Sequence, residues 1–258
     1  RAGNPRVLAQ VQLVFGRLEA RAGHWDRALR HFALVRRHIE AAPSLFLEAC
    51  VALDESSTRF LLGDFTNALK CATDGADAAH RSGWLKGRAV AAANSAYFAV
   101  RLGRVADAEL HLTLAEAEPF TSPSLQIALL ETRSQLAVLK GDLDGAEALL
   151  AHDRSLSKRV FSWYSLSLAE SEIRLQLRKA KWTAALASAG RALALAAEHG
   201  MYAFVPSLQL RRAIALHAVG RAVPRRELAL GDTDVSLATA STFWLARGAV
   251  AGAEGGRP

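Results

Sequence analysis

A short motif recurs along this chain every 38 to 40 residues, and it limits what the chain can fold into. Its clearest copy is Gly63–Leu69, with the letters GDFTNAL: a glycine, one residue of any type, a bulky apolar residue, two further residues and an alanine. The first positions of the six copies, the last of them weaker, are Gly23, Gly63, Gly103, Gly141, Ala180 and Gly220. A fixed period of this length is the signature of a repeat protein, in which each unit packs on its neighbours.

Each copy has the residues that the turn of a helical hairpin requires. A helix ends at low cost on a residue that tolerates left-handed backbone angles, which is why glycine is common just after the last turn. The bulky residue that follows lies three positions before the alanine, so both are on one face of the next helix, and the small alanine allows close approach of another helix. The bulky residues are Trp25, Phe65, Val105, Leu143 and Trp182, and the alanines are Ala28, Ala68, Ala108, Ala146 and Ala185.

Small residues also recur on the helix before each turn. Seven positions before the six first positions stand Gly16, Ser56, Ala96, Ser134, Ile173 and Ala213, of which only Ile173 is large. We expect these residues and the alanines to meet where two antiparallel helices cross closely. We also expect Trp25, Phe65 and Trp182 to be buried at equivalent places.

The combination of a small residue, a turn glycine, a bulky apolar residue and an alanine resembles the tetratricopeptide repeat (TPR) family over about residues 5–230. The resemblance implies an all-α, right-handed TPR-like α-solenoid of about five to six helical hairpins. The period is longer than the usual 34 residues or so, and Pro43, Pro123 and Pro206 stand at the starts of first helices rather than closing each unit. In its long repeat the chain is similar to the TPR-type superhelices of large bacterial signalling proteins and transcription activators, among them ATP-binding LuxR-type and sigma-54-dependent activators.

Composition and patterning agree with a helical repeat. Of the 258 residues, 51% are hydrophobic, and the apolar residues recur at helical rather than alternating spacing, so we expect no sheet. The predicted helices are 5–22, 25–41, 44–62, 65–81, 84–102, 105–117, one that begins after a cap at Ser122 or Ser124 and ends at Lys140, 143–152, 159–179, 182–198 and 203–219.

Two parts of the chain are predicted: a TPR-like superhelical domain over residues 1–230, and a C-terminal part over residues 231–258 with a capping helix at about 234–247 and a disordered tail. The sequence has no run of 18 apolar residues and no signal peptide, so we expect a cytoplasmic location without membrane contact. Because the chain begins with Arg1 and its only methionine is Met201, we expect it to be a segment of a longer protein.

No sequence pattern indicates catalysis or a metal site. His24, His31 and His38 are seven residues apart, which places them on one helix face but about 10 Å from one another, too far to share a zinc ion. Cys50 and Cys71 lie at unequal distances from the turn of the second hairpin and should not form a disulfide. Paired Cys and His ligands, phosphate-binding glycine loops and a nucleophile elbow are absent from the sequence. We therefore expect no enzyme activity, no metal and no cofactor.

The concave face is the surface that a solenoid of hairpins offers to a ligand, and the first helix of each pair lines it. Counted from each turn, the side chains expected in this groove are Arg17, Arg21, Ser57, Asn94, Tyr97, Arg101, Glu131, Gln135, Glu170, Arg174 and Arg178. Asn94 and Tyr97 interrupt the otherwise apolar run Ala91–Val100, so they either contact a ligand or hydrogen-bond to a neighbouring repeat. Arg101 and Arg174 would suit an anionic group.

Charge is divided into two blocks. Residues 103–153 carry a net charge of −6 and residues 154–226 a net charge of +10, in a chain whose total is +7. These charges either solvate the outer face or form a site for the phosphates of a nucleic acid. Against the second interpretation, Lys158, Arg159, Arg178, Lys179 and Lys181 cluster near turns rather than along one helix.

Three functions remain open. The first is a non-catalytic, ligand-sensing or protein-interaction module of a bacterial signalling protein or transcriptional regulator, which binds a protein, a peptide or a small signalling ligand in the concave groove. The second is a free-standing scaffold protein with the same fold. The third is nucleic-acid binding through the basic block at residues 154–226.

Overall fold

The computed structural model describes residues 3–157 and 163–223. In this part of the chain the secondary structure is helical and contains no strand. The elements are α1 (Pro5–Arg21), α2 (Trp25–Ala41), α3 (Leu45–Leu61), α4 (Phe65–Arg81), α5 (Leu85–Arg101), α6 (Val105–Ala117), α7 (Pro123–Lys140), α8 (Leu143–Ser157), α9 (Trp163–Arg178), α10 (Trp182–Glu198), the 3₁₀ helix η1 (Tyr202–Phe204) and α11 (Val205–Ala218).

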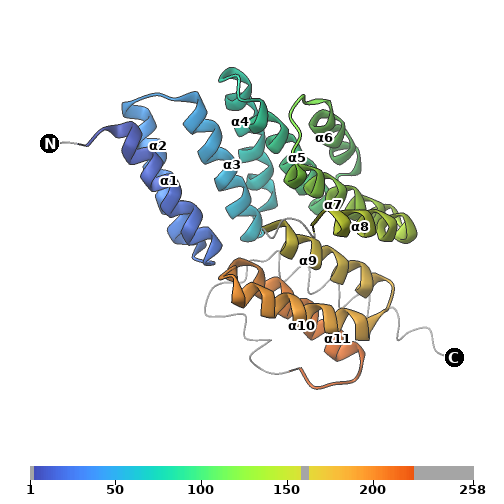
Figure 1. Cartoon of the computed structure of the whole chain (residues 1–258). Helices are drawn as coiled ribbons and strands as arrows, with labels where there is room; N and C mark the ends of the chain where they lie inside the picture. The colour runs from blue at the N-terminus through green and yellow to red at the C-terminus, as the bar shows by residue number, and fades with distance from the viewer. Residues whose placement is uncertain (1–2, 158–162, 224–258) are drawn as a thin grey trace.

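Consecutive helices form antiparallel hairpins that stack in chain order (Figure 1). The first helices of the hairpins contact one another along the stack: α1 with α3, α3 with α5, α5 with α7, α7 with α9, and α9 with α11. Within the described residues there are five hairpins, and α11 takes the place of the first helix of a sixth. The predicted all-α, TPR-like solenoid is confirmed.

The predicted helix ends agree with the structure except around one connection. The helix α8 continues to Ser157, beyond the predicted end at His152, and α9 begins at Trp163 rather than at residue 159. The predicted boundary at residue 230 and the predicted cap and tail over 231–258 lie outside the described residues. None of the described helices is both long enough and apolar enough to cross a bilayer. Cys50 and Cys71 are free thiols, as expected.

The first position of every repeat has left-handed backbone angles. The φ values are 82° at Gly23, 78° at Gly63, 71° at Gly103, 86° at Gly141, 53° at Ala180 and 72° at Gly220. Glycine adopts these angles without a steric penalty, whereas the β-carbon of Ala180 approaches the following carbonyl oxygen. The backbone of the turn at Ala180 is therefore strained, in contrast to the glycine turns of the other copies.

The predicted close crossings of helices are confirmed. The five motif alanines, Ala28, Ala68, Ala108, Ala146 and Ala185, are each 0% exposed. The residues seven positions before the turns are buried too, including the larger Ile173. At Gly16 an added β-carbon would lie 2.4 Å from Cε1 of Phe32, so even a methyl group does not fit between α1 and α2 unless the ring moves.

The prediction that Trp25, Phe65 and Trp182 are buried is wrong, because all three side chains are only half-buried. Each is the first residue of its helix and lies at the edge of the stack, where neighbouring helices cover it from one side. The alanine three residues later is almost one helical turn deeper in the hairpin and is completely covered.

The solenoid curves enough to bring its two ends into contact. The helix η1 contacts α1, and a β-carbon added at Gly23 would lie 3.7 Å from the carbonyl carbon of Tyr202. Figure 1 shows this approach between the end of α1 and the segment before α11. The turn of the first repeat therefore contacts the start of the sixth.

Replacing Ala68 by Leu should lower the free energy of unfolding by about 1–3 kcal/mol, because the crossing of α3 and α4 has no room for a larger side chain. Urea denaturation followed by circular dichroism measures this change. The matched control Ala106→Leu, at an exposed position of α6, should change stability by no more than about 0.5 kcal/mol. If Ala68→Leu unfolds together with the wild type, the assigned crossing is wrong.

Replacing Ala180 by Gly should stabilise the protein by up to about 1 kcal/mol, since glycine removes the strain of the left-handed turn. The same substitution at the exposed Ala187, inside α10, should instead destabilise it by about 1 kcal/mol. Opposite signs for the two variants in thermal denaturation are the expected result, and a loss of stability in both would contradict the strain at Ala180.

Candidate functional site

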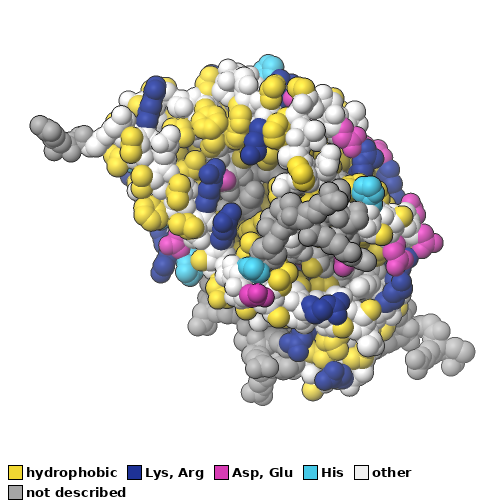
Figure 2. Space-filling view, in the orientation of Figure 1, with side chains coloured by type: hydrophobic (Ala, Val, Ile, Leu, Met, Phe, Trp, Pro, Cys, Tyr) yellow, Lys and Arg dark blue, Asp and Glu magenta, His cyan; other side chains and the backbone are white. Residues whose placement is uncertain are grey.

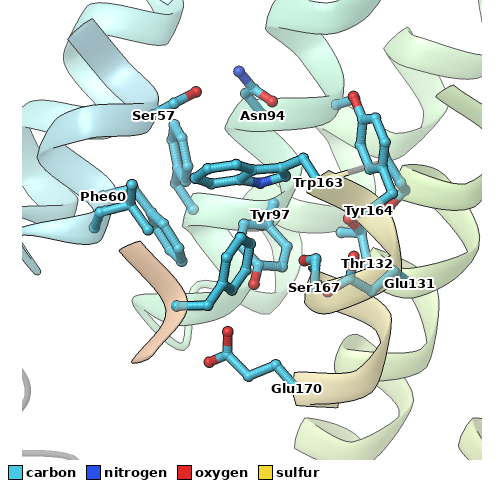
Figure 3. A pocket seen from close by; sticks show the side chains of 15 residues that line it. Ser57, Phe60, Asn94, Tyr97, Glu131, Thr132, Trp163, Tyr164, Ser167 and Glu170 are labelled. Carbon is cyan, nitrogen blue, oxygen red and sulfur yellow. Dashed lines mark hydrogen bonds between the residues drawn. The ribbon is translucent and has the colours of Figure 1, made fainter. Parts of the chain in front are cut away.

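The concave face contains a cavity of about 90 Å³ between α3, α5, α7, α9 and η1 (Figure 3). Its aromatic lining is Phe60, Tyr97, Phe98, Trp163, Tyr164 and Phe204, and its polar lining is Ser57, Asn94, Glu131, Thr132, Ser167 and Glu170. This volume holds a few water molecules or one small side chain, and it is well below the roughly 300–1,000 Å³ of pockets for drug-sized ligands. The cavity is suited to part of an extended ligand that lies along the groove.

Aromatic pairs join neighbouring repeats in the wall of the cavity. The ring centroid of Phe60 on α3 lies 4.9 Å from that of Tyr97 and 5.1 Å from that of Phe98, both on α5. On the other side, Trp163 of α9 lies 4.5 Å from Phe204 of η1. Figure 3 shows the Trp163 ring between the side chains of Asn94 and Tyr97. Because such pairs add about 0.5–1.5 kcal/mol each beyond burial, they hold the wall in place.

A buried polar network around Glu131 links α7 to α9. Glu131 Oε1 accepts hydrogen bonds from Ser167 Oγ at 2.8 Å, from Ser171 Oγ at 2.7 Å and from Gln135 Nε2 at 3.1 Å. Gln135 Nε2 also donates to Ser171 Oγ at 2.8 Å, and Gln135 Oε1 accepts from Arg174 at 2.5 Å. These groups satisfy one another, as buried polar groups must.

Glu170 is neutralised by two arginines. Its Oε1 lies 2.5 Å from Arg211 Nη2 on α11 and 3.5 Å from Arg174 Nη2 on α9. Arg174 was a candidate for an anionic ligand, but its guanidinium already contacts Glu170 and Gln135. Arg174 therefore links neighbouring repeats and is not part of the cavity lining.

Arg101 differs from Arg174 because it has no carboxylate partner among the described residues. Its guanidinium carbon lies 5.6 Å from the ring centroid of Phe60 and 5.5 Å from that of Phe65. Phe60 is part of the cavity wall. The contacts with the two rings orient a half-buried cation beside the cavity without neutralising it.

Asn94 is the polar residue of the cavity that stands out. It lies nine positions before the turn of its repeat. The polar residues at the equivalent position of four other repeats all have partners. The pairs are Asp54 with Arg17, Thr132 with the Ala128 carbonyl, Ser171 with Glu131, and Arg211 with Glu170. Asn94 is half-buried and makes no hydrogen bond to any other described residue. Tyr97, in contrast, has Gln135 of the next repeat as a hydrogen-bonding neighbour. Of the two alternatives, the hydrogen bond to a neighbouring repeat therefore applies to Tyr97, whereas the amide of Asn94 is available to a ligand.

The other groove candidates fall into three groups. Ser57, Asn94, Tyr97, Glu131 and Glu170 line the cavity. Gln135 and Arg174 belong to the polar network and are not part of the cavity lining. Arg17 is held by Asp54 at 2.7 Å, and Arg21 and Arg178 are exposed near the ends of α1 and α9, outside the cavity lining.

Sequence reasoning missed the aromatic part of the site. Phe60, Trp163 and Phe204 lie three or more positions from the residues counted toward the groove, at the ends of their helices. The sequence signal for Trp163 and Tyr164 was an aromatic pair in the first turns of a predicted first helix, in a chain with only 7% aromatic residues.

The boundary between the acidic and basic blocks is occupied by ion pairs. Lys179 Nζ lies 2.7 Å from Asp144 and also contacts Glu147, and Lys181 Nζ lies 3.1 Å from Glu147. Two cations of the proposed nucleic-acid patch therefore pair with carboxylates of the neighbouring repeat. Lys158 and Arg159 lie outside the described residues.

The histidines at the first hairpin have ordinary partners. His24 Nδ1 lies 2.7 Å from Glu19 Oε2, and His31 Nδ1 lies 2.6 Å from Gln12 Oε1. Over residues 3–157 and 163–223, no group of three or more His, Cys, Asp or Glu side chains is arranged to hold a metal ion.

Burial raises the pKa of two carboxyl groups near the cavity. The pKa of Glu131 rises to about 7, although the hydrogen bonds from Ser171 and Ser167 oppose the effect of burial. The pKa of Asp153 on α8 rises to about 8, because its carboxyl is fully buried, neither of its oxygens has a hydrogen-bond partner among the described residues, and the charges of Glu131 and Glu172 are near. Both groups therefore bind protons more tightly in the folded protein than in an unfolded chain.

These shifts predict that stability decreases as pH rises. Between about pH 4 and pH 8 the folded state holds more protons than the unfolded state, so the contribution of Asp153 and Glu131 is fully present below about pH 4 and is lost as pH rises through their raised pKa values. Asp153→Asn, which has no proton to lose, should show a clearly smaller fall in melting temperature from about pH 5 to pH 9 than the wild type. The exposed Asp77→Asn should keep the wild-type fall. An unchanged fall in Asp153→Asn would contradict this account.

No protein-family model matches the sequence, and no curated protein matches it. Among solved structures, the chain is similar to the crystal structure of Rap protein complexed with competence and sporulation factor, with a TM-score of 0.67 and 14% sequence identity. The match covers 83% of this chain and 60% of the Rap chain, so this chain spans about three fifths of that protein's length. At this identity the similarity concerns the fold alone: the two proteins share a TPR-like arrangement of helical hairpins.

Proposed function

We propose that this chain is a non-catalytic module that binds an extended peptide segment on its concave face. In this proposal the amide of Asn94 hydrogen-bonds to the peptide backbone, a small side chain of the peptide enters the cavity, and a carboxylate of the peptide meets Arg101. The proposal rests mainly on Asn94, whose half-buried amide has no partner among the described residues.

The chemistry of the wall supports a peptide as the ligand. A side-chain amide offers both a donor and an acceptor, which matches the N–H and C=O groups of a peptide unit. A half-buried amide without a partner carries a desolvation cost, and a ligand that hydrogen-bonds to it removes that cost. The rings of Trp163 and Tyr97, which follow one another below Asn94 in Figure 3, provide apolar contact for the stem of a side chain.

The charges near the cavity favour an anionic group at one end of the ligand. Glu170 and Arg211 neutralise each other at 2.5 Å, whereas Arg101 has no carboxylate partner among the described residues. A guanidinium offers a planar fork of donors that suits a carboxylate. A peptide with an acidic side chain or a free C-terminus near this position fits best.

The similarity of fold supports a role in recognition. Rap protein was crystallised in a complex with competence and sporulation factor. Together with the resemblance of the long repeat to bacterial signalling proteins and transcription activators, this supports a module that senses a ligand on behalf of a regulator. The basic block is less favoured as a nucleic-acid site, because Lys179 and Lys181 are paired.

Peptides selected from a random display library against the wild-type chain, then labelled with a fluorophore, test the proposal. Asn94→Ala should weaken binding of the selected peptides at least about tenfold, which corresponds to about 1.4 kcal/mol. Its melting temperature should remain close to that of the wild type, because Asn94 contributes no hydrogen bond to another described residue. Arg101→Ala should weaken binding of peptides with a carboxylate, and less so at high salt.

Arg178→Ala is the matched control, since Arg178 is an exposed arginine of a first helix outside the cavity lining, and it should bind like the wild type. Selected peptides that bind Asn94→Ala as tightly as the wild type would contradict the proposal. Tight, steeply salt-dependent binding of a nucleic acid, unaffected by Asn94→Ala, would favour the basic block instead.

A further inference from the structure

The carboxyl group of Glu131 has one oxygen without a partner in the described part of the chain. Its Oε1 accepts all the hydrogen bonds of the side chain, from Ser167, Ser171 and Gln135. Its Oε2 accepts none from another described residue, although the side chain is only 3% exposed and lines the cavity. A buried polar atom without a partner carries a desolvation cost, which a ligand that bonds to it removes.

The charges that line the cavity are negative. Glu131 and Glu170 line it, and no Lys or Arg of the described residues does. Glu170 is paired with Arg211, whereas Glu131 has no cationic partner within the described residues. Burial raises the pKa of Tyr97, the charges of Glu131 and Glu170 raise it further, and the charge of Arg101 lowers it by less. The cavity therefore attracts a cation when Glu131 is ionised.

The ionisable groups around Glu131 come from four helices. They are Tyr97 on α5, Asp153 on α8, Tyr164, Glu170 and Arg174 on α9, and Arg211 on α11. The two arginines are held by Glu170, and Arg174 also by Gln135. Ionisation of Asp153 adds a negative charge near Glu131 and so acts in the same direction as ionisation of Glu131 itself.

Aromatic rings form much of the remaining wall. Phe60, Tyr97 and Trp163 line the cavity from three different helices, α3, α5 and α9. The faces of such rings attract cations, and a cage of rings with a carboxylate is a common site for ammonium groups. An ammonium group is about as large as a water molecule, so a cavity of about 90 Å³ holds it together with the last part of its aliphatic stem.

We propose that the cavity binds a primary ammonium group of the ligand, with Glu131 Oε2 as its carboxylate partner and the rings of Trp163 and Tyr97 as its walls. This inference rests on the proposed function, since it treats the cavity as part of the peptide site. A lysine side chain and a free peptide N-terminus both carry the required group.

The position of Arg101 separates the two charged groups of such a ligand. Arg101 follows Asn94 by seven residues on α5, which is about 10 Å along the helix axis. Asn94 lines the cavity, and Arg101 does not. An extended peptide covers this distance with about three residues. The ligand therefore carries its ammonium group and its carboxylate about three residues apart.

Titration with n-butylammonium chloride, which carries a primary ammonium group on a short stem, tests the site without a peptide. The readout is the indole N–H signal of Trp163 in nuclear magnetic resonance, assigned with Trp163→Phe. It should shift in a saturable way between about 1 and 50 mM. The neutral n-butanol and sodium chloride, at equal concentrations, should leave it in place. The chain has a net charge of +7, and Figure 2 shows Lys and Arg side chains over α1 and α3, so a small cation has no general attraction to it.

Glu131→Gln should weaken binding of n-butylammonium at least about fivefold at pH 8, since the amide carries no charge. The matched control Glu198→Gln, at the exposed end of α10, should bind like the wild type. Circular dichroism checks that both variants are folded. An equal shift with n-butanol, or equal binding by folded Glu131→Gln, overturns the proposal.

The pH dependence of the wild type tests the same point without a substitution. The pKa of Glu131 is about 7, and n-butylammonium, like lysine, keeps its charge up to about pH 10. Binding should therefore tighten by up to about tenfold from about pH 6 to pH 8, as Glu131 loses its proton. A ligand that accepts a hydrogen bond from protonated Glu131 would show the opposite sign, so weaker binding of n-butylammonium at pH 8 contradicts the proposal.

The selected peptides identify the source of the ammonium group. Replacing their lysines by norleucine, or acetylating the N-terminus, should weaken binding at least about fivefold for the group that enters the cavity. A peptide that depends on Asn94 but tolerates both changes overturns this inference and leaves the proposed function intact. Saturable binding of n-butylammonium in a chain that selects no peptide supports the ammonium site and contradicts the proposed function.

Discussion

The close crossing of two helices over an alanine is the interaction on which the rest of this structure depends. The motif alanines of five hairpins are 0% exposed, and the residues they face are glycine, serine, alanine or, once, isoleucine. A left-handed residue sets where each second helix begins, and the alanine sets how closely it approaches the first. Because the left-handed residue and the alanine both recur every 38 to 40 residues, successive hairpins stack in the same register.

A constant register places side chains of successive repeats in columns along the concave face. Nine positions before the turn, the column is polar from the second repeat onward, and its members are hydrogen-bonded or ion-paired at Asp54, Thr132, Ser171 and Arg211. Six positions before the turn, Tyr97, Gln135 and Arg174 connect one repeat to the next. In the third repeat, by contrast, Asn94 has no hydrogen-bond partner and Arg101 no carboxylate partner among the described residues. These two groups are the ones that meet the ligand in the proposed function.

The period and the motif were enough to predict the hairpins, most of the helix ends and the first helices, four of which line the cavity. They did not predict how deep each side chain lies. Trp25 is half-buried because it begins a helix at the edge of the stack, and Arg178 lies outside the cavity lining near the end of its hairpin. Curvature was not predictable either, since it is the sum of small rotations between repeats that no single motif specifies. That curvature brings Phe204 of η1 to the cavity wall and so completes the site.

The central claim is that the free amide of Asn94 receives the ligand, and nuclear magnetic resonance of that amide tests it most directly. The chain has three asparagines, Asn4, Asn67 and Asn94, so their side-chain N–H₂ signals form a small set that Asn94→Ala assigns. On titration with a selected peptide, the Asn94 signals should shift and their exchange with water should slow, while those of Asn67, held by Asp64 at 3.0 Å, should stay in place. Saturating binding of the peptide with the Asn94 signals unmoved would contradict this account.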